Sequence, residues 1–452
     1  MLQRKINTYN PFNGDLVHST IEASEAGVQN ALESLYTAQK KWKKTKLDVR
    51  IAAVESIAEQ LKEKLEECAS MMTREMGKPI VQSRQEINKC IQLCNYYKSK
   101  AEEFLQPSVI TIEDQISHII PQPLGIVLIV MPWNYPFWQV FRAAIPAILA
   151  GNTVLLKHAS NVSGCSELLH DLFLTKDRFF HSIILSSSRI ADVISDHRIA
   201  AVSLTGSEKA GAEVASLAGK NIKPSVLELG GSNALIVMPD ANIDLVVDQT
   251  LKGRFNNNGQ SCIAVKRLLI HESVFQEVIN KVKQEVTKLV VGDPINGAVN
   301  IGPMAKEDLA VELENQVTES VAKGASLALP FKRKDSIVHP TILLNCEIGM
   351  PAFDEELFGP VLACKTFNTF EEAVELSNHN GFGLGVSIFT MDPKLYFNRV
   401  NEFNEGAVFF NQMVSSNPKL PFGGVKKSGY GRELGKAGLL AFTQLQTVVM
   451  PK

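Results

Sequence analysis

Residues 126–136 read IVLIVMPWNYP, an apolar run of strand length that ends in a loop stiffened by two prolines. The apolar character continues to residue 151, but it is interrupted by Pro132, Asn134, Pro136, Arg142 and Pro146, so we expect no membrane span. We interpret residues 125–151 as a buried strand, a loop and a buried helix. A strand joined to a helix in this way is the repeating unit of α/β folds.

Similar short runs bounded by Gly, Pro or Ser recur along the chain. They predict strands at residues 126–130, 153–156, 200–204 and 226–229, with helices between them, and a long amphipathic helix at residues 48–72. A second series predicts strands at 267–270, 342–344 and 361–364, a helix at 274–291 and another helix that begins at Thr369. The pattern indicates two doubly wound halves, each built on a mainly parallel sheet.

Two further strands do not belong to this alternation. Residues 109–120 predict an apolar hairpin that turns at Glu113-Asp114, and the tail 443–449 predicts another edge strand. Exposed strand edges tend to be covered, so we expect these edges to pair across subunits.

Composition limits the class of protein. A chain of 452 residues with 45% hydrophobic and 21% charged residues is long enough for two or three domains. A formal net charge of -2 gives no indication of a nucleic-acid or membrane partner. Seven cysteines without regular spacing argue against a disulfide framework. With no export signal in residues 1–15, we expect a cytoplasmic protein.

One cysteine differs from the other six in its surroundings. Cys262 ends the polar turn FNNNGQSC at residues 255–262, whereas the others lie in apolar helical or strand-like patterns. A thiol in such a turn could be the nucleophile of an enzyme with a covalent intermediate. The alternative is that Cys262, like most free cysteines, is a small buried hydrophobe.

Polar groups follow several predicted strands, where ligands gather in α/β sheets. Asn134 follows the first strand, residues 157–160 (KHAS) follow the second, and Gly206-Ser207 precede a helix after the third. A helix N-terminus can bind phosphate, although a pair of glycines there is a weak signal. Glu228 lies inside the apolar fourth strand, so it is either a satisfied structural acid or a base with a raised pKa.

Five segments in order along the chain strengthen these hypotheses. They are residues 133–136 (WNYP), 227–231 (LELGG), 258–262 (NGQSC), 356–360 (ELFGP) and 421–429 (PFGGVKKSG). Together they resemble the signature motifs of the aldehyde dehydrogenase superfamily, and the resemblance covers essentially the whole chain. The local sequence at residues 138–142 and 157–159 is most similar to the bacterial NAD(P)-dependent succinate-semialdehyde dehydrogenases.

The resemblance implies an α/β fold of two doubly wound domains plus a small β oligomerisation element. The NAD(P)-binding, Rossmann-like domain would comprise residues 1–106 and 122–231, and the catalytic domain residues 232–438. The oligomerisation element would comprise residues 107–121 and 439–452. The protein would be a homodimer or homotetramer that acts on a small aldehyde, with no metal site.

The resemblance also implies a catalytic mechanism. Cys262 would attack the aldehyde carbon, and the Asn134 side chain with the Cys262 N–H would hold the oxyanion of the thiohemiacetal. A hydride would pass to NADP or NAD, leaving a thioester that Glu228 hydrolyses by activating water.

The cofactor contacts implied by the resemblance come from both sides of Cys262. Those near the adenine ribose and phosphates would be Lys157, Ser160, Gly206, Ser207 and Trp133, and those near the nicotinamide end Leu229, Glu356 and Phe358. Ser160 stands where a glutamate is common in the family. Because serine would not repel the extra phosphate of NADP, we expect NADP to be accepted, unless Ser160 merely caps a helix.

Substrate choice depends mainly on Arg142, eight residues after Asn134 in an otherwise apolar segment. It resembles the carboxylate-binding arginine of succinate-semialdehyde dehydrogenases, and a guanidinium can bind a carboxylate through two hydrogen bonds. The alternative is a salt bridge to a neighbouring helix. Some of these enzymes have a second arginine where this chain has Asn256. The loop 415–419 could supply the missing contact through Ser416, Asn417 or Lys419.

The alternatives are other specificities or a different class of protein. A CoA-acylating enzyme usually lacks the acid at Glu228, and a dehydrogenase of broader aldehydes would have no use for Arg142. A non-catalytic structural or binding protein on the same fold is disfavoured because Cys262, Glu228, Asn134 and Glu356 occur together.

Overall fold

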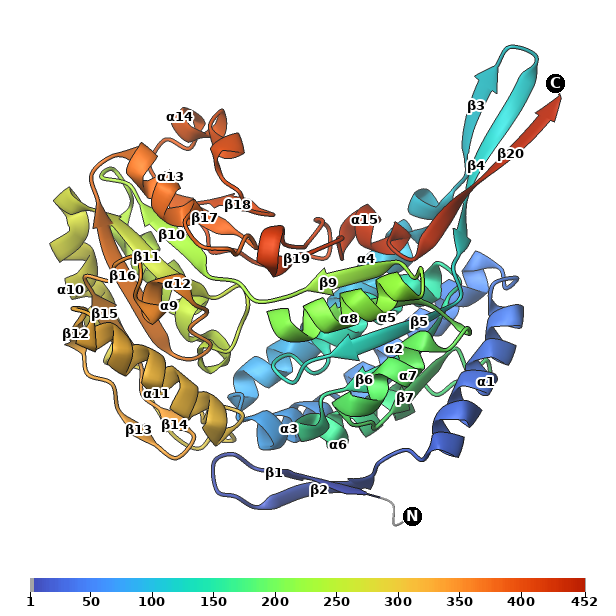
Figure 1. The fold of residues 1–452 in the computed structure, drawn as a ribbon, viewed down its shortest axis with the longest axis horizontal. Coiled ribbons are helices and arrows are strands. Elements are labelled where there is room, and N and C mark those ends of the chain that lie inside the picture. The colour runs from blue at the N-terminus through green and yellow to red at the C-terminus, as the bar shows by residue number, and fades with distance from the viewer. Residues whose placement is uncertain (1–3, 452) are drawn as a thin grey trace.

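The computed structural model describes residues 4–451 and contains two large sheets (Figure 1). The first sheet has six strands in the order β19-β9-β8-β5-β6-β7. Their bounds are β5 Ile126–Met131, β6 Thr153–His158, β7 Phe180–Ile183, β8 Ile199–Thr205, β9 Ser225–Glu228 and β19 Gly429–Tyr430. All neighbours are parallel except β19, which runs antiparallel to β9. The four strands predicted for this half are therefore confirmed, with Leu229 falling just beyond the end of β9.

Helices cover both faces of the first sheet. One face packs against α2 Leu47–Glu63, α3 Leu65–Met76, α4 Ile80–Leu105, α5 Trp138–Leu149 and α6 Ser163–Leu172. The other packs against α1 Glu25–Trp42, α7 Ile190–Ser195 and α8 Glu208–Lys220. Successive side chains of a strand point to opposite faces, so Val127 and Ile129 enter the first core while Ile126 and Leu128 enter the second. Both faces need apolar side chains, which explains the uninterrupted apolar run of β5.

The second sheet is built in the same way from seven strands in the order β12-β15-β16-β11-β10-β17-β18. Their bounds are β10 Asn233–Val237, β11 Val265–His271, β12 Ser326–Leu329, β15 Thr341–Leu344, β16 Val361–Phe367, β17 Val386–Phe389 and β18 Val408–Phe410. One face packs against α9 Ile243–Phe255 and α10 Phe275–Val286. The other packs against α11 Glu307–Ala322, α12 Pro351–Asp354 and α13 Phe370–Asn378. The doubly wound architecture is confirmed for both halves.

A third sheet extends away from the body of the molecule, with the chain's C-terminal end at its tip (Figure 1). It contains β3 Ser108–Ile112, β4 Gln115–Pro123 and β20 Thr443–Pro451, and β4 pairs antiparallel with both neighbours. Large apolar side chains on it are exposed, among them Val109, Ile112, Leu445 and Val449. The predicted hairpin and tail strand therefore pair with each other within one chain. A separate hairpin, β1 Lys5–Tyr9 with β2 Leu16–Ile21, lies near the other terminus.

Two predicted helices differ from the structure. The helix expected at residues 48–72 is broken at Lys64, whose backbone (φ -93°, ψ 16°) leaves the helical region and separates α2 from α3. The apolar period hides this break because Leu61 and Cys68 are buried on either side of it. The helix expected at 274–291 ends at Val286, and Val291, within the expected range, forms a parallel β-bridge with Ile301 instead.

Within residues 4–451, no helix combines the length and apolarity that a membrane crossing requires. The same residues contain no cluster of three or more His, Cys, Asp or Glu side chains suited to a metal ion.

Candidate active site

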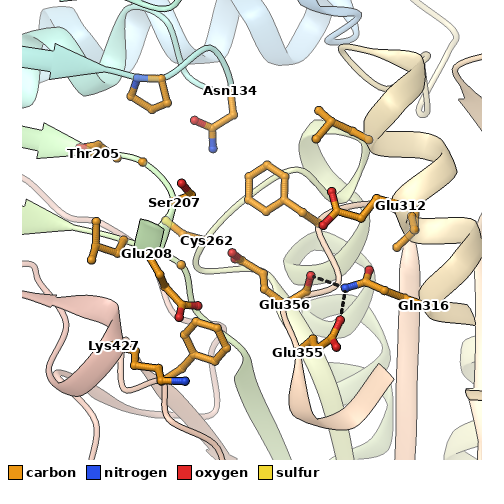
Figure 2. Close-up of a pocket in the computed structure, with 18 of the residues that line it drawn as sticks. Asn134, Thr205, Ser207, Glu208, Cys262, Glu312, Gln316, Glu355, Glu356 and Lys427 are labelled. Carbon is orange, nitrogen blue, oxygen red and sulfur yellow. Dashed lines mark hydrogen bonds between the residues drawn. The ribbon is translucent and has the colours of Figure 1, made fainter. Parts of the chain in front are cut away.

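A cleft of about 590 Å³ is lined by residues at the strand ends of the first sheet and by α11, which packs on the second sheet, and Figure 2 shows its walls. On one side lie residues that follow strands of the first sheet, such as Asn134 and Ser207, together with Cys262. On the other side Glu312 and Gln316 of α11 face the cavity. The carboxyl ends of the parallel strands therefore border the cleft, as expected for an α/β ligand site.

An unusual backbone turn holds Cys262 at this cleft. Asn257, Asn258 and Gly259 are consecutive left-handed residues with φ of 55°, 56° and 73°. Asparagine tolerates this conformation better than most residues, and glycine adopts it freely. A Cβ at Gly259 would also collide with the backbone of Gly359. The polar composition of the turn is thus a requirement of its backbone geometry.

Arg254, at the end of α9, ties the cysteine turn to the segment 356–360. Its Nη2 donates to the carbonyl oxygens of Gly259 at 2.8 Å and Leu357 at 3.2 Å, and also to that of Gly359. The guanidinium is fully buried, and burial lowers the pKa of Arg254 to about 9. Two of the five sequence motifs are therefore fixed to each other through one side chain.

Cys262 is half-buried, whereas the other six cysteines are buried. Burial raises the pKa of the Cys262 thiol to about 11, while the positive charges of Lys266 and Arg142 act in the opposite direction. In this state the thiol is protonated at neutral pH, so it must lose its proton before it can attack.

Asn134 is positioned by the cysteine turn. Its side-chain Nδ2 donates to the backbone carbonyl oxygen of Gln260 at 3.2 Å, and its backbone carbonyl oxygen accepts from Asn257 Nδ2 at 2.8 Å. Because Asn134 and Cys262 both line the cleft, an amide N–H donor and a thiol face the same space. This is the arrangement that an oxyanion hole needs.

Glu228, the last residue of β9, is only 2% exposed. Neither of its carboxylate oxygens has a hydrogen-bond partner within residues 4–451. Burial and the nearby Glu433 carboxylate raise its pKa well above the usual range, against the opposing charges of Arg142 and Arg432. Of the two roles left open for Glu228, the geometry favours the base with a raised pKa. Its side chain is not among those that line the cleft, since it points toward Gly423.

Glu356 faces the cleft and is held by Lys266, a residue that the sequence analysis did not select. Lys266 Nζ donates to Glu356 Oε1 at 2.6 Å and to the carbonyl oxygens of Ser261 and Cys262 at 2.8 Å each. Gly231 N–H donates to the same Glu356 oxygen at 3.1 Å. Two consecutive charged residues, Lys266 and Arg267, in the buried strand β11 were the signal that could have revealed it.

The cofactor residues predicted nearest the phosphates and nicotinamide lie together. The cleft is lined by Trp133, Gly206, Ser207, Leu229, Glu356 and Phe358. The rings of Trp133 and Phe358 are perpendicular, with centroids 5.8 Å apart. Ser207 caps the N-terminus of α8, which borders the cleft, and the neighbouring Thr205 hydroxyl is buried without a partner in the described chain. A helix N-terminus, an unpaired hydroxyl and two aromatic rings fit a nicotinamide dinucleotide.

Lys157 and Ser160 lie outside the residues that line this cleft. Lys157 lies near the carboxyl end of β6 and pairs there with Val130 of β5. Because β5 and β6 are parallel, Ser160 and Trp133, which come after these strands, lie at the same edge of the sheet. Ser160 is exposed, and its side chain caps neither the short 3-10 turn at Ser160–Val162 nor α6. The alternative role of Ser160 as a helix cap is therefore not observed.

The two predicted substrate residues also lie away from the cofactor cleft. Arg142, on α5, is 2% exposed and forms an ion pair with Glu433, while its guanidinium lies 4.7 Å from the Phe422 ring centroid. The alternative of a salt bridge is thus observed, although Glu433 lies in an extended segment and not on a helix. Ser416 is buried, and its Oγ accepts from Lys89 Nζ at 2.7 Å. Neither Glu433 nor Lys89 was selected from the sequence.

Comparisons with known proteins agree with this geometry. The model of the aldehyde dehydrogenase family matches residues 2–448. A probable succinate-semialdehyde dehydrogenase of Synechocystis sp., named as NADP(+)-dependent, is 40% identical and covers 98% of this chain and 99% of its own. The NAD(P)+ succinate semialdehyde dehydrogenase Sad of Escherichia coli is also 40% identical and covers 97% and 96%. The crystal structure of succinic semialdehyde dehydrogenase from Streptococcus pyogenes with NADP+ superposes with a TM-score of 0.96 at 30% identity, covering 99% and 100%.

Proposed function

This chain belongs to the aldehyde dehydrogenase family and is an aldehyde-oxidising enzyme, and we propose that it converts succinate semialdehyde to succinate with NADP or NAD. The observation that carries the choice of substrate is Arg142. Its buried guanidinium acts electrostatically on the Cys262 thiol and lies outside the cofactor cleft. A buried cation near the nucleophile suits an aldehyde that carries a carboxylate at its far end.

The reaction begins at Cys262. The Cys262 thiol releases its proton to solvent water and its sulfur attacks the aldehyde carbon, while the developing oxyanion accepts hydrogen bonds from Asn134 Nδ2 and the Cys262 backbone N–H. For this to happen, Asn134 exchanges its contact with the Gln260 carbonyl for one with the oxyanion. Bound NADP or NAD supplies the hydride acceptor.

Glu228 completes the cycle by hydrolysis. The carbonyl of the Cys262 thioester is attacked by a water molecule whose proton passes to Glu228. The C–S bond breaks, the sulfur takes up the proton held by Glu228, and the carboxylic acid leaves. A buried carboxylate without a partner and with a raised pKa has a high affinity for that proton, which suits it to act as the base.

The residues that would hold the cofactor fall into two groups, one near its nicotinamide and pyrophosphate and one near its adenine ribose. Glu356 would bind the nicotinamide ribose, Leu229 and Phe358 would contact the ring end, and Trp133 with Gly206 and Ser207 would contact the pyrophosphate. Lys157 and Ser160 would meet the adenine ribose at the end of β6. The exposed hydroxyl of Ser160 leaves room for the additional phosphate of NADP, and Lys157 adds a positive charge there.

We further propose that the enzyme is a cytoplasmic homodimer or homotetramer. Support for subunit pairing comes from the exposed apolar residues on the extended sheet β3-β4-β20, which a second copy would cover. Support for a reducing compartment comes from the seven cysteines, all of which are free thiols.

An absorbance assay of NADPH and NADH formation tests the substrate. A panel of malonate, succinate and glutarate semialdehydes beside butanal should give the highest kcat/KM with succinate semialdehyde. Equal kcat/KM for butanal and succinate semialdehyde would identify an aldehyde dehydrogenase of broader specificity instead. A higher value for glutarate or malonate semialdehyde would keep the carboxylate and correct the chain length.

A further inference from the structure

A surface depression of about 400 Å³ separates α4 from the loop 415–418, on residues that are not shared with the cofactor cleft. Its rim includes the exposed Gln85, Asn88 and Gln92 of α4. Lys89 lies in this depression and is half-buried. Its Nζ donates to Ser416 Oγ at 2.7 Å and lies 4.2 Å from the Trp138 ring centroid.

Lys89 differs from the fully buried lysines of this protein in having no carboxylate partner. Lys78 pairs with Glu86, and Lys266 pairs with Glu356. Within residues 4–451, no carboxylate oxygen lies within 4.0 Å of Lys89 Nζ. The nearest acid on its own helix, Glu86, is occupied by Lys78 and by the N–H groups of Phe137 and Trp138. A desolvated ammonium in this position has unused capacity to bind an anion.

Helix α5 connects the surroundings of Lys89 with those of Cys262. Trp138 and Arg142 are one turn apart on α5, so they occupy the same face of that helix. The charge of Arg142 acts on Lys89 and also on Cys262. Arg142 is thus near enough to both Lys89 and Cys262 for its charge to act on each, and of the three residues Lys89 is the one that lines the surface depression.

The charges of Arg142, Glu433 and Lys89 together favour Lys89 as a further contact for a substrate carboxylate. Arg142 is paired with Glu433, so its guanidinium attracts a substrate carboxylate less strongly than an unpaired one would. A substrate carboxylate bound beside this pair needs one further positive charge. Lys89 supplies it, and the Ser416 hydroxyl beside it supplies a second donor.

We propose that Lys89 and Ser416 form the entrance part of the carboxylate-binding site, and that Lys89 selects anionic aldehydes together with Arg142. This inference rests on the proposed function and adds a specificity-determining residue to it. The carboxylate accepts from Lys89 Nζ and Ser416 Oγ, while the aldehyde end of the substrate extends past Trp138 and Arg142 toward Cys262.

A dependence on pH follows from the surroundings of Lys89. Burial lowers the pKa of Lys89 to about 8, with smaller contributions from the charges of Arg142 and Lys78. Cys90 and Glu86 act in the opposite direction and raise it. The ammonium is charged below that pH and neutral above it, whereas the substrate carboxylate stays ionised throughout. The ratio of kcat/KM for succinate semialdehyde to kcat/KM for butanal should therefore fall as the pH rises through 8. Titration of Cys262 and Glu228 cancels in this ratio, because both substrates use them.

The test compares Lys89→Met with Lys89→Arg, and with Lys100→Met as a matched control on the exposed side of α4. Lys89→Met should raise KM for succinate semialdehyde about tenfold or more, leave butanal oxidation unchanged and make the ratio independent of pH. Lys89→Arg should retain most of the selectivity, and Lys100→Met all of it. Unchanged butanal oxidation also shows that the variant folds.

Two outcomes overturn the inference. One is an equal loss with both aldehydes in Lys89→Met, and the other is an unchanged ratio in that variant. Failure of the proposed function is distinguishable, because the wild-type enzyme would then show no preference for succinate semialdehyde over butanal. In that case succinate is tested as an inhibitor of butanal oxidation, and equal inhibition of wild type and Lys89→Met would reject the site.

Discussion

Lys266 Nζ lies 2.6 Å from Glu356 Oε1 and 2.8 Å from the carbonyl oxygen of Cys262, so one buried cation joins the nucleophile's backbone to a carboxylate in the cofactor cleft. The same charge acts to lower the pKa of the Cys262 thiol, while Glu356 and Glu228 act to raise it. The reactivity of the thiol and the position of the Glu356 carboxylate in the cleft therefore depend on one side chain.

Lys266→Met should slow the alkylation of Cys262. With a thiol pKa of about 11, the rate of reaction with iodoacetamide rises with pH through the neutral and alkaline range, since only the thiolate reacts. Removal of the Lys266 charge should shift this profile to higher pH and lower the rate at pH 8 about tenfold. KM for the cofactor should also rise, because Glu356 loses its partner.

Lys288→Met is the control for this experiment, since Lys288 is exposed and pairs only with Glu285. Its alkylation profile should match that of the wild-type enzyme. An unchanged profile in Lys266→Met would mean that the charge of Lys266 does not reach the thiol.

Arg142→Met should separate anionic from neutral aldehydes and should also destabilise the fold. KM for succinate semialdehyde should rise at least tenfold while KM for butanal changes little. Because Glu433 is left buried without its partner, the free energy of unfolding should fall by about 3 kcal/mol. The double variant Arg142→Met/Glu433→Gln should recover part of that stability in urea unfolding, but not the low KM. Equal KM changes for the two aldehydes would remove Arg142 from the substrate site.

Ser160→Glu should change the choice of cofactor. A carboxylate at this exposed position would repel the extra phosphate of NADP and accept hydrogen bonds from the ribose hydroxyls of NAD. The kcat/KM for NADP should fall about tenfold or more, while that for NAD should stay the same or rise. Ser160→Gln has a similar size without the charge and should leave the preference of the wild-type enzyme in place. A parallel loss with both cofactors in Ser160→Glu would place the residue away from the ribose.

The alternation of apolar runs was sufficient to predict the central strands of both sheets, such as β5, β6 and β8, because these are buried on both faces and are largely apolar. Shorter or more exposed strands, such as β7, β12 and β18, were not predicted. Local breaks were not predictable in this way. The helix break at Lys64 leaves the apolar period intact, so only the backbone angles reveal it. The strand-like end of the segment 274–291 depends on a bridge to Ile301, a contact that local sequence does not encode.

The site was predictable where chemistry requires a particular residue at a strand end or in a turn. Asn134, Ser207 and Cys262 are of this kind, and all three line the cleft. Lys89 and Glu433 were not predicted as site residues, because their contacts are with residues distant in sequence. Lys89 contacts Ser416, and Glu433 contacts Arg142. An isolated lysine in an amphipathic helix is indistinguishable from a solvated one until the opposing loop is known.

Glu228→Gln should uncouple hydride transfer from hydrolysis. The amide keeps the size of the buried side chain but cannot accept a proton from water, so the thioester on Cys262 should accumulate. Mixing with saturating aldehyde and cofactor should give a burst of one NADPH per active site, followed by steady turnover slower than wild type by about 100-fold or more. In the wild-type enzyme the hydrolysis rate should rise with pH, because the raised pKa of Glu228 moves the ionisation of this base to a higher pH than that of an ordinary carboxyl. Glu312→Gln, an exposed change on the opposite wall of the cleft, should retain both the burst and the steady rate. Wild-type steady turnover in Glu228→Gln would show that another group activates water, and loss of the burst itself would assign Glu228 to the deprotonation of Cys262 instead.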